Sequence, residues 1–435
     1  MNSLAVVGIA IVILIVLLML SIPLPYCFGG SLAFLVMFGD VSMKSMMLYT
    51  FSQCTGTVLL ASPMFILAGT YMGGSGIAKR LLDVADAFVG RIKGGLGVVS
   101  VVTCAIMGAI SGSGFTGVAA TGPIMIPRME EQGYPRGFAT ALVTVSSVLG
   151  LLIPPSAIMV VYGWVTETSI LACFLSTVIP GILITVLFCM INLIECKKFD
   201  LKVMPPMPFH TKIKQVGHRT VVAIPALFMP VIILGGIYGG IFTPTEAAAV
   251  AAIYALPVGF WIYRSMTLKD FKQLTFEAIC SIGAIMTMIF VCLMLAQSLV
   301  MLQVPQAIID LIFGLTHNRI IILIIVNLFL FVVGMIVNDT TGMLICAPLL
   351  LPLMKEIGVS SVHFAAIMGV NLAMGGVTPP YASILYLGMR IGNAEFKDIF
   401  GPTMKLLFFG YVPIVILTAF VPALSEFLPR MFGYL

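Results

Sequence analysis

The chain has 435 residues, of which 60% are hydrophobic and only 9% are charged, with a formal net charge of +5 and a mean hydropathy of +1.16. This composition excludes a water-soluble surface and predicts an all-α polytopic membrane protein. Nine cysteines without a C-x-x-C pair, and four histidines, offer no disulfide or metal framework, so we expect no cofactor.

Apolar runs in the first half are long enough to cross a hydrocarbon layer of about 30 Å. They cover residues 4–22, 24–42, 51–74, 136–165 and 169–195. No Lys or Arg precedes the first run and no small-residue cleavage site follows it, which favours a retained helix over a signal peptide. Residues 76–93 are amphipathic and predict an arm helix along the membrane surface.

Residues 95–127 predict a re-entrant hairpin with the tip Ser-Gly-Ser-Gly-Phe-Thr-Gly at 111–117. Irregular backbone at membrane depth is tolerated only inside protein or against a wet cavity. The next run, 136–165, contains Pro154-Pro155, which removes two donors and predicts a broken helix. We therefore expect a binding site where the tip meets the break.

Residues 197–219 are rich in lysine, arginine and proline, and predict a cytoplasmic linker without a helix between the halves 1–196 and 220–435. Thr243 and Glu246, which follow this linker, have the spacing of a helix cap. The second half then presents an arm, a hairpin and a broken helix in the same order as the first. Its predicted elements are apolar runs 220–242, 244–263, 275–302 and 402–425, arm helix 304–319, hairpin 320–353, and broken helix 362–390 with Pro379-Pro380.

The two halves are also related residue by residue. A shift of 225 positions lays residues 116–163 on 341–388 without a gap, and fourteen of the 48 pairs are identical. Nine of these are Gly, Pro or Thr, which shape the backbone rather than add bulk. The halves therefore share an irregular backbone design.

The distribution of basic residues sets the predicted orientation. With both hairpins re-entrant, seventeen Lys and Arg fall on the side of the linker and four on the other side, as the positive-inside rule expects. Five crossings then separate the hairpins, so the repeat has inverted topology and both termini are predicted to be periplasmic.

Two classes of ligand suit the predicted breaks. Carbonyls released before the prolines favour a small cation, and the amides that open the next half-helix favour an anion. Asp339, at the second tip, is predicted either to mark a functional site or to cap the following helix.

The sequence resembles the large membrane subunit, DctM-like, of the TRAP (tripartite ATP-independent periplasmic) transporters over nearly its whole length. The matching motifs are Ser111-Gly112-Ser113, Pro127-Arg128-Met129, Gly133-Tyr134-Pro135, Ile153-Pro154-Pro155-Ser156, Phe242-Thr243-Pro244-Thr245-Glu246-Ala247, Asn338-Asp339-Thr340 and Thr378-Pro379-Pro380.

The resemblance implies a sodium-driven elevator transporter that imports an organic acid across a bacterial inner membrane. Its partners would be a four-helix small membrane subunit and a periplasmic substrate-binding protein. The acid could be an acidic sugar such as sialic acid, or a C4-dicarboxylate.

The resemblance also implies three groups of site residues. One sodium site would use Ser111, Ser113, Gly150, Ile153 and Pro154, the other would use Asn338, Thr341, Gly375, Thr378 and Pro379, and the substrate would lie near Thr116, Ser156, Asp339 and Tyr381.

Two other classes of function remain as alternatives. A channel could also use re-entrant loops, although inverted hairpins fit alternating access better. An intramembrane aspartyl hydrolase would need a second acid, whereas the repeat partner of Asp339 is Gly114. A serine nucleophile at Ser113 has no histidine or lysine near it in sequence.

Overall fold

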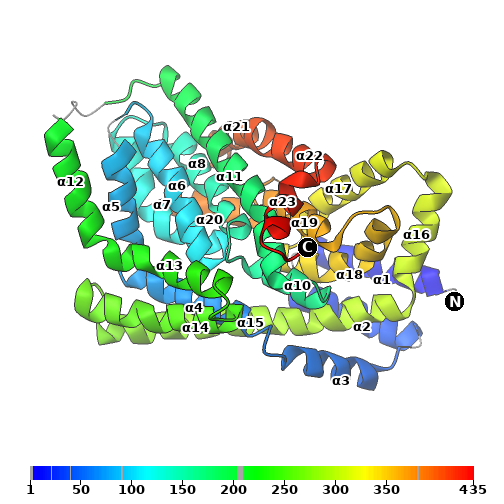
Figure 1. The fold of residues 1–435 in the computed structure, drawn as a ribbon. Helices are drawn as coiled ribbons and strands as arrows, with labels where there is room; N and C mark the ends of the chain where they lie inside the picture. Colours follow the sequence, from blue (N-terminus) through cyan, green and yellow to red (C-terminus); the bar gives the residue numbers. More distant parts are fainter. Residues whose placement is uncertain (1–2, 21, 40, 90–91, 203–208, 380–381) are drawn as a thin grey trace.

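The computed structural model describes residues 3–20, 22–39, 41–89, 92–202, 209–379 and 382–435. These described residues form helices and no strand (Figure 1). Helices satisfy their own backbone polar groups, which a hydrocarbon environment requires. Six of the described helices are long and apolar enough to cross a membrane, and a bent pair would make a seventh.

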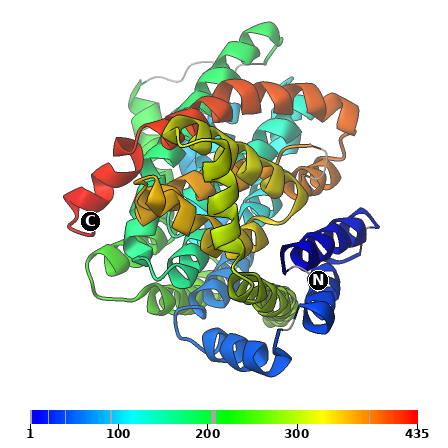
Figure 2. The ribbon, with the colours of Figure 1, turned by 90° about the vertical axis from the view of Figure 1, so that its right-hand side faces the viewer.

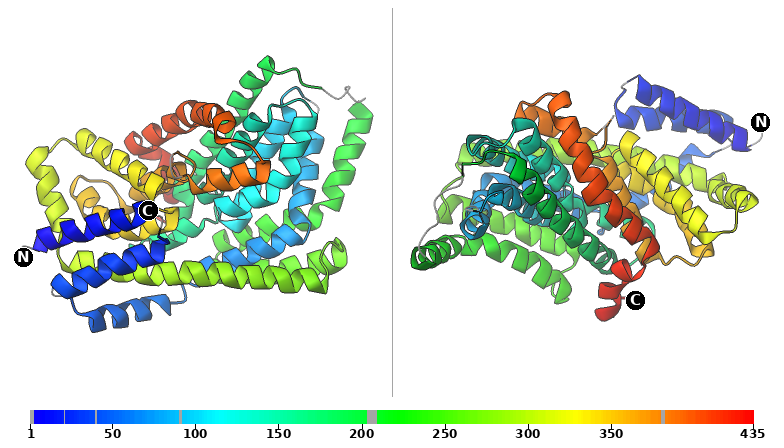
Figure 3. Two further views of the ribbon diagram at one scale, coloured as in Figure 1. Left: turned by 180° about the vertical axis from the view of Figure 1, so that it is seen from behind. Right: turned by 90° about the horizontal axis from the view of Figure 1, so that it is seen from above.

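One group of helices, which we call the scaffold helices, lies along one side of the molecule (Figures 1 and 3). Helices α14 and α15 both pack on α4, and α15 also packs on α2 and α3. Figure 2 shows the N-terminal helices at the edge of the molecule beside α15. The scaffold helices are α1 (Ser3–Met19), α2 (Leu24–Phe38), α3 (Met43–Cys54), α4 (Ala61–Gly74), α13 (Ile224–Tyr238), α14 (Pro244–Pro257) with the π-helical turn η2 (Val258–Ile262), and α15 (Leu268–Met301).

The start of α14 confirms the predicted cap. The Thr243 hydroxyl accepts from the Glu246 amide at 3.3 Å, and the Glu246 carboxylate accepts from the Thr243 amide at 2.8 Å. Each side chain thus satisfies a backbone donor that the first turn would otherwise leave unpaired.

Two amphipathic helices precede the hairpins. Helix α5 (Ile77–Val89) lies within the predicted 76–93, and α16 (Val304–Leu315) lies within the predicted 304–319. The second is shorter than predicted because Thr316 is extended and Asn318 already caps the next helix, its side chain accepting from the Ile320 amide at 2.9 Å.

The remaining helices form the hairpins, the broken helices and their neighbours. In the first half they are α6 (Gly95–Ser111), α7 (Gly114–Glu131), α8 (Arg136–Ser147), α9 (Leu149–Leu152), α10 (Ala157–Val165) and α11 (Ile170–Glu195), followed by the 3₁₀ turn η1 (Cys196–Lys198). In the second half they are α17 (Arg319–Ile336), α18 (Asp339–Glu356), α19 (Ser361–Gly375), α20 (Ser383–Gly392), α21 (Phe396–Leu406), the π-helical turn η3 (Leu407–Tyr411), α22 (Val412–Phe420) and α23 (Ala423–Met431).

Both hairpins are longer than predicted. Helix α7 continues to Glu131 rather than ending at residue 127, and α18 continues to Glu356 rather than ending at 353. Each of these helices contains two prolines, which packed membrane helices tolerate when neighbours satisfy the freed carbonyls. With 18 residues, or about 27 Å, α7 and α18 each approach the thickness of the hydrocarbon layer.

The predicted helix-free linker is wrong in its second part. Helix α12 (Phe209–Val222) begins directly after the last linker proline, Pro208, and meets α13 at a bend of 60°. The prolines all precede the helix, so none of them interrupts it.

Equivalent helices of the two halves make equivalent contacts. Helix α10 packs on α18 of the second hairpin, and α20 packs on α7 of the first. Helix α6 packs on α9, as α17 packs on α19. Each broken helix therefore touches both hairpins, which brings the two tips into one region.

Candidate functional site

The first tip rests on the break of the first broken helix. Gly112 has a positive φ of 63°, and its carbonyl accepts from the Ala157 amide at 3.3 Å. A Cβ at this position would lie 3.0 Å from the carbonyl oxygen of Pro155. Both the backbone angle and the close approach require glycine. The turn brings the Ser111 hydroxyl to within 3.4 Å of the carbonyl of Ser113.

Two backbone carbonyls that are released at the break already accept hydrogen bonds from side-chain hydroxyl groups. The Ser156 side chain donates to the carbonyl of Leu151, and the Thr177 hydroxyl of α11 donates to the carbonyl of Leu152 at 2.6 Å. Ile153, an expected sodium ligand, is extended where the helix breaks. Thr177 was absent from the sequence predictions, because α11 lies outside the hairpin and the broken helix.

The same half contains a backbone contact between two glycines. A Cβ on Gly108 would lie 1.9 Å from the Cα of Gly150, and a Cβ on Gly150 would lie 2.4 Å from the Cα of Gly108. No side chain fits between α6 and α9 at this point. Gly150 thus lies at the contact between the hairpin and the break, and its close partner Gly108 was not predicted.

The second tip has a different local structure. Asn338 caps α18, with its side-chain oxygen accepting from the Thr340 amide at 2.9 Å. Thr341 is buried, and its hydroxyl donates to the sulfur of Met288 on α15 at 3.1 Å. The second hairpin therefore contacts a scaffold helix directly.

The second break repeats the glycine contact. A Cβ on Gly375 would lie 2.2 Å from the carbonyl carbon of Gly334 on α17. The Thr378 hydroxyl donates to the carbonyl of Met374 at 2.7 Å, and Thr378 lines a separate, largely apolar cavity between α17, α19 and α22. Pro379 follows, whereas Tyr381, an expected substrate residue, lies outside the described residues.

Both tips line a single cavity of about 420 Å³. Gly112, Ser113 and Phe115 come from the first tip, and Asn338, Asp339 and Thr340 from the second. The opposite wall belongs to the scaffold helices, and Leu151, Ala157 and Ile158 of the first broken helix complete the lining. The scaffold contributes Leu24, Pro25, Ser62, Ile66, Ala284, Ile285 and Met288.

The cavity contains some of the expected site residues and not others. Ser113, Asn338 and Asp339 line it. Ser156 is fully buried in the helix break, and the methyl group of Thr116 lies toward Gly69 of α4. The structure adds Ser62, a scaffold residue for which the hairpin motifs gave no signal.

Asp339 is the one ionisable side chain among the described residues that line this cavity. No Lys, Arg or His nitrogen of the described chain lies within 4.0 Å of its carboxylate. Asn338 caps α18, and the Asp339 carboxylate also interacts with the Thr340 amide and with its own amide at the start of this helix.

Two helical hairpins whose tips share a cavity with long apolar helices form the fold of a multi-pass membrane protein. The solved structure of the YdaH transporter of Alcanivorax borkumensis shares this fold with a TM-score of 0.59 at 16% identity, covering 88% of this chain and 89% of that chain.

The chain belongs to a particular transporter family. Residues 11–424 match the model of the DctM component of the tripartite ATP-independent periplasmic transporters. The chain is 35% identical over 399 residues to the C4-dicarboxylate TRAP transporter large permease protein DctM of Pseudomonas aeruginosa, covering 92% of each. It is 32% identical over 408 residues to the sialic acid large permease protein SiaM of Vibrio cholerae, covering 93% of this chain and 94% of the relative.

A further relative differs in length. The isethionate permease protein DctMQ of Oleidesulfovibrio alaskensis is 34% identical over 397 residues, which are 91% of this chain but 62% of that protein. All three relatives are named as transporter permeases, in agreement with the transporter family to which the chain belongs.

Proposed function

We propose that this chain is the sodium-coupled large membrane component of an importer of organic acids in a bacterial inner membrane. It works with a small membrane subunit and a periplasmic binding protein that delivers the substrate. The observation that carries the proposal is the cavity that both hairpin tips share, because it offers hydroxyl, amide and carboxylate oxygens beside helix starts.

The substrate lies between the tips, next to Ser113, Asn338 and Asp339. Helices α7, α10 and α18 begin at the cavity. The Ala157 and Thr340 amides are already bonded within the protein, so a bound carboxylate would use other amides of these first turns. An acidic sugar such as sialic acid and a C4-dicarboxylate both fit this arrangement. Relatives named for each of these substrates have similar identity to this chain, 32% and 35%.

Sodium binds at the two helix breaks. At the first, the Ser113 carbonyl approaches the position of Gly150, where a Cβ would lie 3.3 Å from it. At the second, Asn338 and Thr341 open α18. A hard cation takes about six oxygens, and a tip and a break supply them together.

The hairpins and broken helices move as one body against the scaffold helices, as in an elevator. Contacts made by three arginines support the inverted arrangement. Arg128 and Arg219, both assigned to the cytoplasmic side, bind the same carboxylate of Asp86. Arg136, also assigned to that side, donates to the carbonyl of Gly392, two residues beyond Arg390. Both termini then lie in the periplasm.

The test is uptake into proteoliposomes that contain both membrane subunits, with and without sodium and the binding protein. Radiolabelled sialic acid and succinate are the probes. Uptake should require a sodium gradient, and uptake that proceeds equally without sodium would disprove the coupling. Conductance in the absence of either probe would favour the channel instead.

Single substitutions test the proposed ion ligands. Asn338→Ala should raise the sodium concentration for half-maximal uptake, because it removes a side-chain oxygen at the tip, and Ser113→Ala should do the same. Ser42→Ala removes a comparable cap from α3, where Ser42 accepts from the Ser45 amide at 3.4 Å outside the cavity. This control should leave the sodium dependence unchanged.

A further inference from the structure

A single carboxylate joins three parts of the chain. Asp86, on arm helix α5, accepts from Arg219 of α12 at 2.9 Å and from Arg128 of hairpin helix α7 at 3.3 Å, both through the same oxygen. Its side chain is 16% exposed. Charge-assisted hydrogen bonds in such a sheltered position are stronger than those at an open surface.

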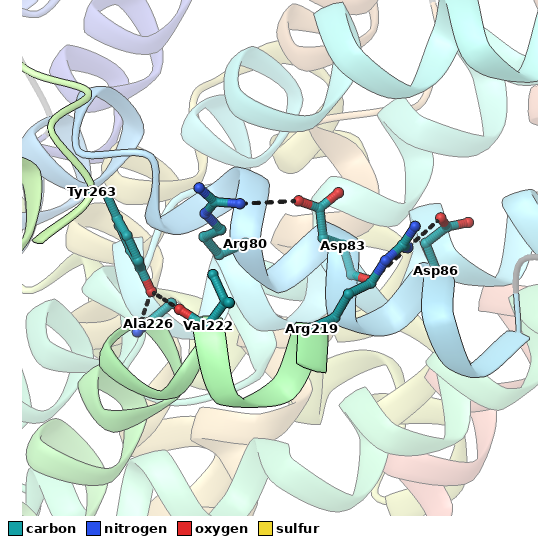
Figure 4. A network of polar contacts seen from close by, with 7 residues as sticks. All are labelled: Arg80, Asp83, Asp86, Arg219, Val222, Ala226 and Tyr263. Carbon is teal, nitrogen blue, oxygen red and sulfur yellow. Dashed lines mark hydrogen bonds and ion pairs between the residues drawn. The ribbon is translucent and has the colours of Figure 1, made fainter. Parts of the chain in front are cut away.

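One side of this junction is fixed to the scaffold. Arg219 also donates to the backbone carbonyl of Asp83 at 3.1 Å, which ties α12 to the arm by a second bond. The Tyr263 hydroxyl, at the end of η2, donates to the Val222 carbonyl and accepts from the Ala226 amide, both at 3.1 Å (Figure 4). The bend between α12 and α13 is thereby held in place.

Arg80 adds to this anchor. Its guanidinium stacks over the ring of Tyr263 at 5.4 Å and lies 3.9 Å from the Asp83 carboxylate. Asp86 is therefore immobilised on the side of α12 and α13. Its bond to Arg128 adds an ionic contact with α7 to the packing of α5 on α6, the other helix of the first hairpin.

The second half lacks an equivalent link. Under the shift that relates the two halves, Arg128 corresponds to Leu353, which has no charge. Asp310 of arm helix α16 accepts from Gln306 of the same helix at 3.2 Å, and no ion pair with it occurs in the described chain. The ion pair between Asp86 and Arg128 is therefore a feature of the first half that the repeat does not reproduce in the second half.

We propose that Asp86 is a positioning residue that, through Arg128, holds the first hairpin in the position seen in this structure. The inference rests on the proposed function, since it assumes that the hairpins move relative to the scaffold helices. Movement of the hairpin relative to α5 would have to break the contact between Asp86 and Arg128. Asp86 thus sets the balance between two positions of the hairpin rather than binding substrate.

The test measures the exposure of the hairpin tip from each side of the membrane. A Phe115→Cys reporter, which lies in the cavity lining, is placed in a chain in which Cys54, Cys189 and Cys280 are replaced by serine, because these three native cysteines are not fully buried. An impermeant maleimide is applied to right-side-out and inside-out vesicles that contain the complex. The ratio of the two labelling rates reports the position of the hairpin.

Asp86→Asn and Arg128→Gln should each reduce the wild-type preference between the two sides by about two- to fivefold, the range expected from a partly exposed ion pair. Asp86→Glu, which keeps a carboxylate at this position, should retain the wild-type preference. Asp310→Asn, the matched change on the other arm, should not alter the ratio. A purely structural role would lower thermal stability in detergent and leave the ratio unchanged.

Two negative results have separate meanings. If sodium and substrate do not change the wild-type labelling ratio, the hairpin does not move and the proposed function fails. If they change it but Asp86→Asn matches the wild type, the role of Asp86 is disproved. An equal shift with Asp310→Asn would also disprove it.

Discussion

Substitution of Gly375 tests whether the contact between α17 and α19 is as close as the structure shows. In Gly375→Ala the new Cβ would lie 2.2 Å from the carbonyl carbon of Gly334, whereas ordinary contact begins at 3.4 Å. The two helices must therefore move apart until that ordinary separation is reached. The obstructing atoms belong to backbone, so no side-chain rotation can relieve the overlap.

Overpacking of this kind costs about 1–3 kcal/mol, and we expect the upper end because a helix must move. In Gly334→Ala the nearest atom would lie 3.2 Å away, so the overlap is slight and the expected cost is below about 1 kcal/mol. Gly283→Ala is the matched control, because nothing lies within 4 Å of its Cβ. It should be neutral or should stabilise α15 by up to about 1 kcal/mol.

The assay is denaturant-induced unfolding of the three purified variants in detergent, with the unfolding free energy compared with that of the wild type. The predicted order of destabilisation is Gly375→Ala, then Gly334→Ala, then Gly283→Ala. If Gly375→Ala and Gly283→Ala had equal stability, the reasoning from the helix contact would be refuted.

Three other predictions follow from single contacts. Thr243→Ala should cost about 1 kcal/mol of unfolding free energy, because it removes the cap shared with Glu246 at the start of α14, and a loss below about 0.3 kcal/mol would contradict the cap. Asn371 donates to the side chain of Asn327 at 2.8 Å, so a double-mutant cycle with Asn→Leu at both positions should give a coupling of about 0.6 kcal/mol, whereas strict additivity would show that the pair adds nothing. Thr177→Val removes the hydroxyl that donates to the Leu152 carbonyl, and it should change the sodium concentration for half-maximal uptake at least twofold. If the sodium dependence of uptake equals that of the wild type, the Leu152 carbonyl is not part of the ion site.

Local and compositional features were predictable from the sequence. The proline breaks and the Thr243–Glu246 cap depend on a residue and its near neighbours, and the structure has them at the predicted positions. The predicted apolar run 51–74 is instead divided by a turn between α3, which ends at Cys54, and α4, which begins at Ala61. The first broken helix, predicted at 136–165, begins at Arg136 and ends at Val165. The gapless shift between the halves predicted that they have equivalent backbone bends, because it aligned the glycines and prolines that bend the chain.

Contacts between distant segments required the tertiary structure. Gly150 contacts Gly108, and the equivalent contact in the second half joins Gly375 to Gly334. Gly108 and Gly334 are 226 positions apart, whereas the gapless shift is 225, so the alignment of the repeat does not pair these two glycines. Thr177 and Ser62 belong to helices outside the motifs, and packing alone brings them to the first break and to the cavity.

Hydrophobicity, charge bias and proline act locally, so the sequence alone predicts a duplicated membrane protein with two hairpins and two broken helices. The packing of the helices, by contrast, fixes which tip residues share a cavity and which released carbonyls are already bonded. It also places Asp86 of the arm against Arg128 of the first hairpin. Such pairings arise when helices pack, and no spacing along the chain records them.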